Sequence, residues 1–397
     1  MKSTSRKRIL RMVILDVCGF CVLAYLVCAQ VFRLFPWKPV EIELPDPKQA
    51  AVSTVPTATP KPTDTPAPTD APQPTDEPTE PVSSDGAGAP PADTPVPAET
   101  PEPTPEPTPE PSGLLKGKFA EKFTSGEVIS NDTEYRSENI AIELTPKIGY
   151  VCSKCSHTAE APGTCAFCGS EIQDKKGTYG TYVTFTVADI YIQDINCLRT
   201  AYVSRTKDTK RVKQFCLENN GILGVNTDLF INYIGRHGWF IRNGVEIQHN
   251  KTISSDLCIL YQDGTMETID YKKQTIDTNA ILARTPLQIW YFGPQLLDQD
   301  GAAKTKFNSS LGKQNPRTVV GYYEPGHYCF FVVDGRDKDR GMTFEELSQL
   351  CADMGMKAAY NMDGGASSGM YFNGKTYGQN DRDTGDVVYI AEPVKEN

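Results

Sequence analysis

The sequence predicts an α+β domain, built mostly from antiparallel sheet, with at least one βαβ unit, a small zinc-knuckle insert and a preceding transmembrane helix. Three observations support this fold class. Asn-Gly and Asp-Gly pairs join short apolar runs, one strand-helix-strand pattern lies near the carboxyl terminus, and only residues 114–397 are rich enough in apolar side chains to fold. The formal net charge is −10, and no stretch of basic residues with interleaved aromatic residues stands out, so we do not expect the protein to bind nucleic acid.

The amino-terminal segment has the length and polarity of a membrane anchor. From Met12 to Phe32 the chain is apolar except for Asp16 and Gln30, which suits a spanning helix over residues 12–35. Basic residues concentrate in the preceding tail, residues 1–11, so the positive-inside rule places that tail in the cytoplasm. We therefore expect a single-pass protein of the cell membrane with its folded domain outside. A cleaved signal peptide is the alternative, although the apolar run is long for one.

Residues 36–113 form a predicted stalk. Nineteen of the 30 prolines lie between Pro56 and Pro111, among Thr, Ala, Asp, Glu and Ser. So few apolar residues cannot offset the entropy of folding, and the Pro-Glu-Pro-Thr repeat favours polyproline II at about 3.1 Å per residue. We expect a disordered, extended spacer.

Four cysteines within residues 150–170 have the spacing of two zinc knuckles. Cys152 and Cys155 form one Cys-x-x-Cys pair and Cys165 and Cys168 form the second. Such turns direct four thiolates to one tetrahedral zinc ion, and a site with four sulfur ligands leaves no position for water, so the zinc would be structural. Two disulfides are the alternative in an oxidising compartment. His157 is not needed as a ligand.

Turn residues predict three hairpins, at residues 240–247, 259–266 and 370–377. A helix is predicted over residues 207–219, with Val212, Phe215 and Cys216 on one face and Gly221 ending it before a strand at residues 222–230. Near the carboxyl terminus, residues 328–333 read as a buried strand. Thr343 and Glu346 then form a capping box for a helix, and residues 357–363 read as the next strand.

This last pattern predicts a βαβ unit whose parallel strands both end in Asp-Gly. Asp334 and Asp363 would then lie together at the carboxyl ends of the strands, where α/β sheets usually bind ligands. Alternation along the strands places Asn361 beside Asp363, and likewise Asn226 beside Asp228. The backbone of Gly364 and Gly365 and the hydroxyls of Ser367 and Ser368 suit an oxyanion, and Arg317, followed by Thr318, can pair with phosphate. Each residue taken singly has a structural alternative as a turn cap or surface charge.

Several of these segments resemble, in order, the phosphodiester glycosidase family. They include Val225-Asn-Thr-Asp-Leu-Phe, Phe292-Gly-Pro-Gln-Leu, Pro316-Arg-Thr, Val333-Asp-Gly-Arg and Asn361-Met-Asp-Gly-Gly-Ala-Ser-Ser, with the last the most specific. The resemblance spans roughly residues 135–393. Thr227 departs from the family, which often has Gly there, and the zinc knuckles interrupt what looks like a hairpin between residues 140–144 and 182–185.

The resemblance implies hydrolysis of a sugar-1-phosphodiester at the sugar carbon. We expect Asp363 or Asp228 to act as nucleophile or base, with Asp334 as a further catalytic candidate. Arg317 and Thr318 are expected to hold the phosphate, and Asn226, Asn361 and Ser368 the sugar. The substrate would be a phosphorylated glycan or a sugar phosphodiester, in a glycan or envelope polymer, and a catalytic divalent cation is left open. The competing hypotheses are a non-catalytic glycopolymer-binding protein and a phosphodiesterase that cleaves on the phosphorus side.

Overall fold

The computed structural model describes residues 113–250, 252–307, 309–336 and 339–394. The predicted cytoplasmic tail, membrane anchor and all but the last residue of the stalk lie outside the described residues. Within the described ranges, no helix has both the length and the apolar character needed to span a bilayer.

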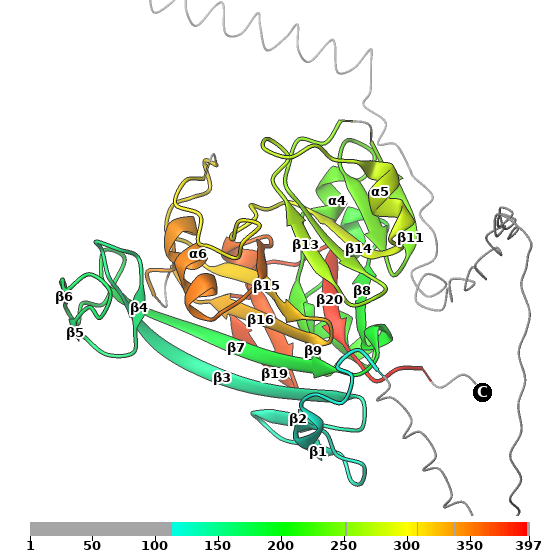
Figure 1. Cartoon of the computed structure of the whole chain (residues 1–397), viewed down its shortest axis with the longest axis horizontal. Helices are drawn as coiled ribbons and strands as arrows, with labels where there is room; N and C mark the ends of the chain where they lie inside the picture. Colours follow the sequence, from blue (N-terminus) through cyan, green and yellow to red (C-terminus); the bar gives the residue numbers. More distant parts are fainter. Residues whose placement is uncertain (1–112, 251, 308, 337–338, 395–397) are drawn as a thin grey trace, which may run out of the picture. The chain divides into compact units, whose positions relative to one another are not determined.

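The described chain forms three large sheets, in which every strand pairing is antiparallel (Figure 1). The first sheet has the order β1-β2-β3-β7-β16-β15-β17, with β4 paired to β3. Its strands are β1 (Ile129–Ser130), β2 (Glu134–Arg136), β3 (Ile140–Val151), β4 (Thr158–Ala159), β7 (Tyr182–Ile192), β15 (Arg317–Glu324), β16 (His327–Val333) and β17 (Ala358–Asn361).

Two five-stranded sheets complete this framework. One has the order β11-β10-β14-β12-β13 and the other the order β19-β18-β9-β20-β8. The former contains β10 (Trp239–Arg242), β11 (Val245–His249), β12 (Leu257–Tyr261), β13 (Met266–Ile269) and β14 (Pro286–Tyr291). The latter contains β8 (Leu198–Tyr202), β9 (Leu223–Asn226), β18 (Gly369–Phe372), β19 (Lys375–Gly378) and β20 (Asp386–Ile390).

Short helices connect these strands. The α-helices are α3 (Val212–Glu218), α4 (Phe230–Tyr233), α5 (Thr278–Ala283) and α6 (Phe344–Asp353). The 3-10 turns are η1 (Ala120–Lys122), η2 (Ile195–Cys197), η3 (Thr206–Asp208) and η4 (Gly365–Ser367).

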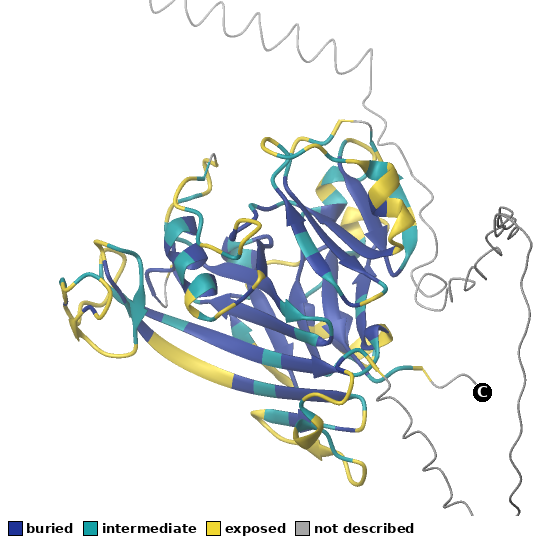
Figure 2. Cartoon of the chain, in the orientation of Figure 1, coloured by how far each residue is buried: buried dark blue, intermediate teal, exposed yellow. Residues whose placement is uncertain are grey.

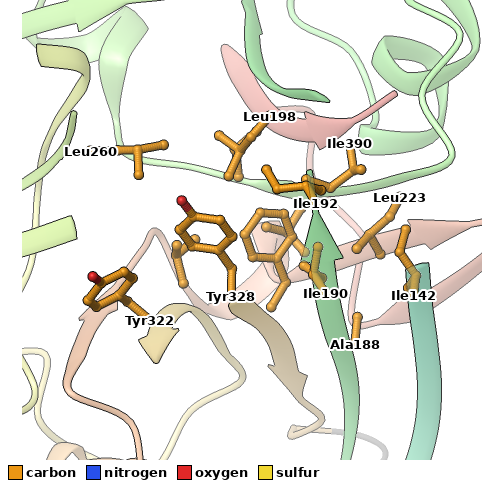
Figure 3. Close-up of a cluster of buried hydrophobic side chains, with 14 of the residues drawn as sticks. Ile142, Ala188, Ile190, Ile192, Leu198, Leu223, Leu260, Tyr322, Tyr328 and Ile390 are labelled. Atoms are coloured by element: carbon orange, nitrogen blue, oxygen red, sulfur yellow. The ribbon is translucent and has the colours of Figure 1, made fainter. Parts of the chain in front are cut away.

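One apolar core joins the three sheets. Ile190 and Tyr328 from the first sheet, Leu260 from the second, and Leu223 and Ile390 from the third belong to the same buried cluster (Figure 3). Burying these faces against one another removes apolar area from water, which is the main force that holds sheets together. Figure 2 shows the result as strands that are buried along most of their length. The site residues project from the ends of strands fixed by this core.

All three predicted hairpins are present. Asn243-Gly244 joins β10 to β11 and Asn373-Gly374 joins β18 to β19, and both pairs have the positive φ angles of a type I′ turn. The hairpin between β12 and β13 uses a different turn. Asp263 keeps a negative φ, and only Gly264 is left-handed, at a φ of 79°. The Asp-Gly pair therefore marks the hairpin correctly but not its turn type.

The predicted βαβ unit is correct in its helix and wrong in its strand pairing. Thr343 and Glu346 make the expected capping box at the start of α6. The strands on either side, β16 and β17, run in the same direction but do not pair, because β15 lies between them and is antiparallel to both. The structure therefore has a split βαβ unit, in which β15 separates the two parallel strands. The sheet is antiparallel in all the pairings described, and not mixed.

The first predicted helix is shorter than expected. The α-helix covers only Val212–Glu218, with Val212, Phe215 and Cys216 buried as predicted. Asn220, at a φ of 53°, takes the left-handed position after its end, so Asn220 and not Gly221 reverses the chain. The following strand is also short, because the chain leaves β9 at Asn226 and enters α4.

The cysteine segment interrupts a long hairpin, as the sequence predicts. Strands β3 and β7 pair continuously from Ile140 with Ile192 to Tyr150 with Tyr182. The four cysteines lie at the far end of this pair, beside β4 and the two-stranded sheet of β5 (Gly163–Thr164) and β6 (Glu171–Ile172) (Figure 1).

Candidate active site

Three strand ends of the first sheet bring the predicted polar residues together. Arg317 begins β15 opposite Val333, the last residue of β16, and Val319 pairs with Asn361, the last residue of β17. Because β15 is antiparallel to both neighbours, its start lies at the same edge as their ends. Arg317 therefore lies between the segments that begin at Asp334 and Asp363.

Asp363 is the best placed carboxylate at this edge. The residue is only 8% exposed, and its Oδ1 accepts a hydrogen bond from the Gly364 N–H at 3.0 Å. The Arg382 guanidinium donates to Oδ2 and also, at 2.7 Å, to the Ser367 hydroxyl. Burial raises the pKa of Asp363, and the Arg382 charge and these hydrogen bonds oppose the rise. The result is a desolvated carboxylate with a cation beside it.

The glycine turn after Asp363 lets other arginines approach. Gly365 has a φ of 66°, and a Cβ at this position would lie 2.7 Å from an Arg336 nitrogen. A Cβ on Gly364 would lie 4.0 Å from Nη1 of Arg317. With Arg382 on Asp363, three guanidinium groups converge on this turn from different segments. Guanidinium groups grouped in this way suit a phosphate.

Arg317 is held more tightly than the sequence predicts. Its Nε donates to the Met342 carbonyl at 3.0 Å and its Nη2 to the Leu311 carbonyl at 2.8 Å. Its guanidinium also lies 4.1 Å from the Phe344 ring centroid. Burial lowers the pKa of Arg317 to about 10. These contacts fix the side chain and leave Nη1, on the side of Gly364, as the nitrogen that faces the turn.

Several predicted sugar ligands instead bind other protein groups. Asn226 is fully buried, and its Oδ1 accepts from the Thr318 hydroxyl at 2.8 Å and the Gly369 N–H at 3.0 Å. Its Nδ2 donates to the Asp363 carbonyl at 2.7 Å. Asn361 is buried as well, with Nδ2 2.9 Å from the Gly293 carbonyl. These side chains brace the segments around Asp363 and do not face a solvent-filled site.

The serines after the glycine turn differ from each other. Ser367 binds Arg382 and belongs to the site described above. Ser368 is fully buried, and its hydroxyl has no hydrogen-bond partner within the described residues. Ser367 thus shares the Arg382 guanidinium with Asp363, whereas Ser368 is enclosed by the protein.

Asp228 lies in a buried ion cluster. Both of its oxygens accept from Nη2 of Arg242, at 2.9 and 3.1 Å, and Oδ2 also accepts from the Tyr291 N–H at 2.8 Å. Arg242 binds Asp386 at 2.9 Å as well, and all three side chains are fully buried. Burial raises the pKa of Asp386. Because the Asp228 side chain is fully buried and paired with a buried cation, whereas the Asp363 side chain keeps 11% of its surface exposed, Asp228 fits a structural role better than nucleophilic attack.

Asp334 lies at the same edge as Asp363, as predicted. Its Oδ2 accepts from the Thr184 hydroxyl at 2.9 Å, and its N–H donates to the Thr184 carbonyl at 3.0 Å. These bonds tie the end of β16 to β7 and orient the turn that carries Arg336.

Sequence reasoning missed Arg382, Arg336 and Arg242. Arg382 lies in the charged segment Asp381-Arg-Asp, between a hairpin and the last strand, and only that charge density could have drawn attention to it. Arg336 follows the Asp-Gly pair already considered as a site. Arg242 gives no local signal, because its acidic partners are 14 and 144 residues away.

The four predicted zinc ligands form one cluster. The Sγ atoms of Cys152, Cys155, Cys165 and Cys168 all lie within 4.8 Å of one another, with nearest pairs at 3.5 and 3.6 Å. A tetrahedral zinc with bonds of about 2.3 Å needs sulfurs about 3.8 Å apart, so the donor set fits this ion. The thiols are free and not joined as disulfides. In the part of the chain that the structure describes, no other group of three or more His, Cys, Asp or Glu side chains could hold a metal.

His157 has a separate role in this module. Its ring stacks on Phe167 with centroids 3.4 Å apart, and its Nδ1 lies 2.7 Å from Asp353 at the end of α6. The prediction that His157 is not a ligand agrees with this geometry. The contact joins the cysteine module to the helix whose first residues pack on Arg317.

Comparison with known families supports the resemblance read from the sequence. Residues 219–393 match the family model for phosphodiester glycosidases. The predicted resemblance is confirmed over this segment, and the expectation of a hydrolase that acts on glycosyl bonds is confirmed with it. The matched segment contains Asp363, the glycine turn and all three arginines, but not the cysteine module. No curated protein sequence matches the chain.

Three solved structures are similar to the chain at low sequence identity. The catalytic domain of zebrafish N-acetylglucosamine-1-phosphodiester alpha-N-acetylglucosaminidase, auto-inhibited by its pro-peptide, has 17% identity and a TM-score of 0.46, covering 68% of this chain and 97% of that one. A hypothetical protein from Synechocystis has 11% identity and a TM-score of 0.40, covering 67% and 64%. A putative exported protein from Burkholderia pseudomallei has 12% identity and a TM-score of 0.38, covering 72% and 99%.

Proposed function

We propose that the domain hydrolyses the glycosidic bond of a sugar-1-phosphodiester, releasing a free sugar and a phosphomonoester. The observation that carries this proposal is the buried Asp363 carboxylate beside a turn on which Arg317, Arg336 and Arg382 converge. The match to phosphodiester glycosidases covers the same segment.

In the proposed reaction, Asp363 supplies the electron pair. It attacks the anomeric carbon directly, forming a covalent glycosyl ester that water then hydrolyses to the free sugar, or it removes a proton from a water that attacks the same carbon. Either route needs the ionised carboxylate, and the Arg382 charge favours that form in a site where burial opposes it. The carbon–oxygen bond to phosphate breaks, and its electron pair leaves with the phosphate oxygen.

In this proposal, the arginines stabilise the negative charge of the leaving phosphate. A phosphomonoester leaves as a stable anion, so a full acid catalyst is less important than in ordinary glycosidases and cationic donors become more important. Arg382 and Arg336 are exposed and able to reach a bound phosphate. Arg317 contributes through Nη1, because its other nitrogens hold the carbonyls of Leu311 and Met342. Thr318, Asn226 and Asn361 act through the backbone that they brace.

The cellular setting is also a proposal. We place the chain in the cell membrane through residues 12–35, with the stalk at 36–113 extending the hydrolase towards a glycan or polymer of the envelope. This setting rests on the apolar and proline-rich composition of these segments. We also assign a structural zinc ion to the four cysteines, on the basis of their sulfur distances.

A direct assay tests the proposed function. The full chain in detergent is incubated with a synthetic hexose-1-phosphodiester, and reducing sugar and sugar phosphate are measured separately. We expect reducing sugar from the wild type and a loss of about a hundredfold or more in turnover for Asp363→Asn. The matched control is Asp383→Asn, which removes an exposed carboxylate from the same loop as Arg382 and should retain activity. Equal turnover in both variants would exclude Asp363 from catalysis, and binding without turnover would favour a non-catalytic protein.

A further inference from the structure

A cavity lies next to residues that flank the proposed active site, although neither Asp363 nor any of the three arginines lines it. It has a volume of about 610 Å³, and we call it the lysine pocket after the four lysines that line it, Lys272, Lys273, Lys304 and Lys306. Aromatic side chains, among them Tyr271 and Phe307, form other parts of its wall. A cavity with both cations and aromatic faces suits a ligand that is both anionic and ring-containing.

The charge of the lysine pocket is not balanced by its own acids. Four lysines and two aspartates line it, which leaves a formal charge of 4 − 2 = +2. Asp270 is shared by Lys304, at 3.1 Å, and Lys273, at 3.8 Å. The second aspartate, Asp256, accepts hydrogen bonds from backbone N–H groups. Among the ion pairs of the described residues, none includes the exposed Lys272 or Lys306, so these two cations can bind a ligand.

The pocket and the active site share structural supports. The side chain of Asn361, two residues before Asp363, donates to the carbonyl of Gly293 in the pocket wall, and its N–H donates to the Pro294 carbonyl at 3.1 Å. Elsewhere in the lining, the Leu311 carbonyl accepts from Arg317 at 2.8 Å. Two parts of the pocket lining are thus attached to residues that flank the glycine turn.

We infer that the lysine pocket binds a second anionic group of the substrate, beyond the phosphodiester that is cleaved. This inference rests on the proposed function and narrows it: the substrate class is a chain of sugars with repeated phosphate or similar anionic groups, and not an isolated diester. One anionic group lies at the three arginines while the next lies at Lys272 and Lys306. The aromatic wall contacts the sugar ring between them.

A binding experiment tests the pocket without turnover. Inorganic tripolyphosphate is titrated into the full chain by calorimetry, for the wild type and for Lys272→Gln/Lys306→Gln. We expect affinity to fall by about tenfold in the double variant, because two charge-assisted contacts are lost. The matched control is Lys116→Gln/Lys207→Gln, which removes two exposed lysines elsewhere and should bind as the wild type does. Equal loss in both double variants, or no loss in either, overturns the inference.

A kinetic experiment links the pocket to the substrate. Two synthetic hexose-1-phosphodiesters are compared, identical except that the alcohol portion of one ends in an additional phosphate. We expect the wild type to prefer the phosphate-bearing diester by about tenfold in kcat/KM, and the pocket variant to lose this preference. A preference that survives in Lys272→Gln/Lys306→Gln contradicts the inference. If neither diester is hydrolysed by the wild type, the proposed function fails, and the tripolyphosphate titration still decides whether the pocket binds anions.

Discussion

Replacing Asp228 by asparagine separates a structural role for this residue from a catalytic one. The variant keeps the size of the side chain and one carbonyl oxygen, but it loses the negative charge that Arg242 binds at 2.9 and 3.1 Å. Arg242 retains Asp386 as a charged partner at 2.9 Å, so the buried cluster changes from two carboxylates and one guanidinium to one of each. The cost is therefore that of a weakened charged hydrogen bond, about 1–3 kcal/mol of unfolding free energy.

Arg242→Met is a second variant whose loss of stability can be compared with that of Asp228→Asn. The variant leaves both Asp228 and Asp386 buried without their cation, and breaking a buried pair in this way costs about 3–5 kcal/mol. We expect the loss of stability to be larger for Arg242→Met than for Asp228→Asn. Urea unfolding, followed by intrinsic fluorescence, measures both.

The activity of the folded fraction completes the test. If Asp228 is structural, Asp228→Asn lowers stability while turnover per folded molecule stays within about tenfold of the wild type. A variant that unfolds at the wild-type urea concentration but hydrolyses no diester would refute this reasoning and restore Asp228 as a catalytic residue.

Three further predictions follow from the site and the cysteine module. Arg382→Gln should move the acid limb of the pH profile of kcat/KM to higher pH, because burial already raises the pKa of Asp363 and removing the Arg382 charge raises it further. The control is Arg205→Gln, which should leave the limb in place. An unchanged limb in Arg382→Gln would contradict the prediction. Gly365→Ala should lower turnover and reduce the free energy of unfolding by about 1–2 kcal/mol, because the φ of 66° is left-handed and the added Cβ would displace Arg336. Calorimetric melting measures the stability and diester hydrolysis measures the turnover. Wild-type values for both would contradict the prediction. Atomic absorption should find one zinc per chain and less in Cys165→Ser, whereas Cys351→Ser should keep the metal; two disulfides seen by mass spectrometry after alkylation would rule the zinc site out.

Local sequence signals predicted the parts of the fold that depend on neighbouring residues. The Asn243-Gly244 turn and the Thr343 capping box appear in the structure because each is fixed by residues at most a few positions apart. The four cysteines were recognisable for the same reason, since their spacing alone brings the thiols together.

Strand order and side-chain partners could not be predicted in this way. The sequence gives no local sign that β15 lies between β16 and β17, because antiparallel and parallel neighbours can carry the same buried pattern. The prediction that strand alternation places Asn226 beside Asp228 is wrong, because β9 ends at Asn226, and the partners of the two side chains, Asp363 and Arg242, are set by tertiary packing. A polar residue at a strand end can brace the backbone or face a ligand, and only the structure distinguishes these roles.

The position of bond cleavage tests the central claim most directly. Hydrolysis of a hexose-1-phosphodiester in water enriched in oxygen-18, followed by mass spectrometry of the phosphomonoester, shows which bond to the bridging oxygen breaks. Attack at the sugar carbon predicts a phosphomonoester without the heavy isotope. Heavy oxygen in the phosphomonoester, or sugar phosphate as the product, would show cleavage on the phosphorus side and contradict the account.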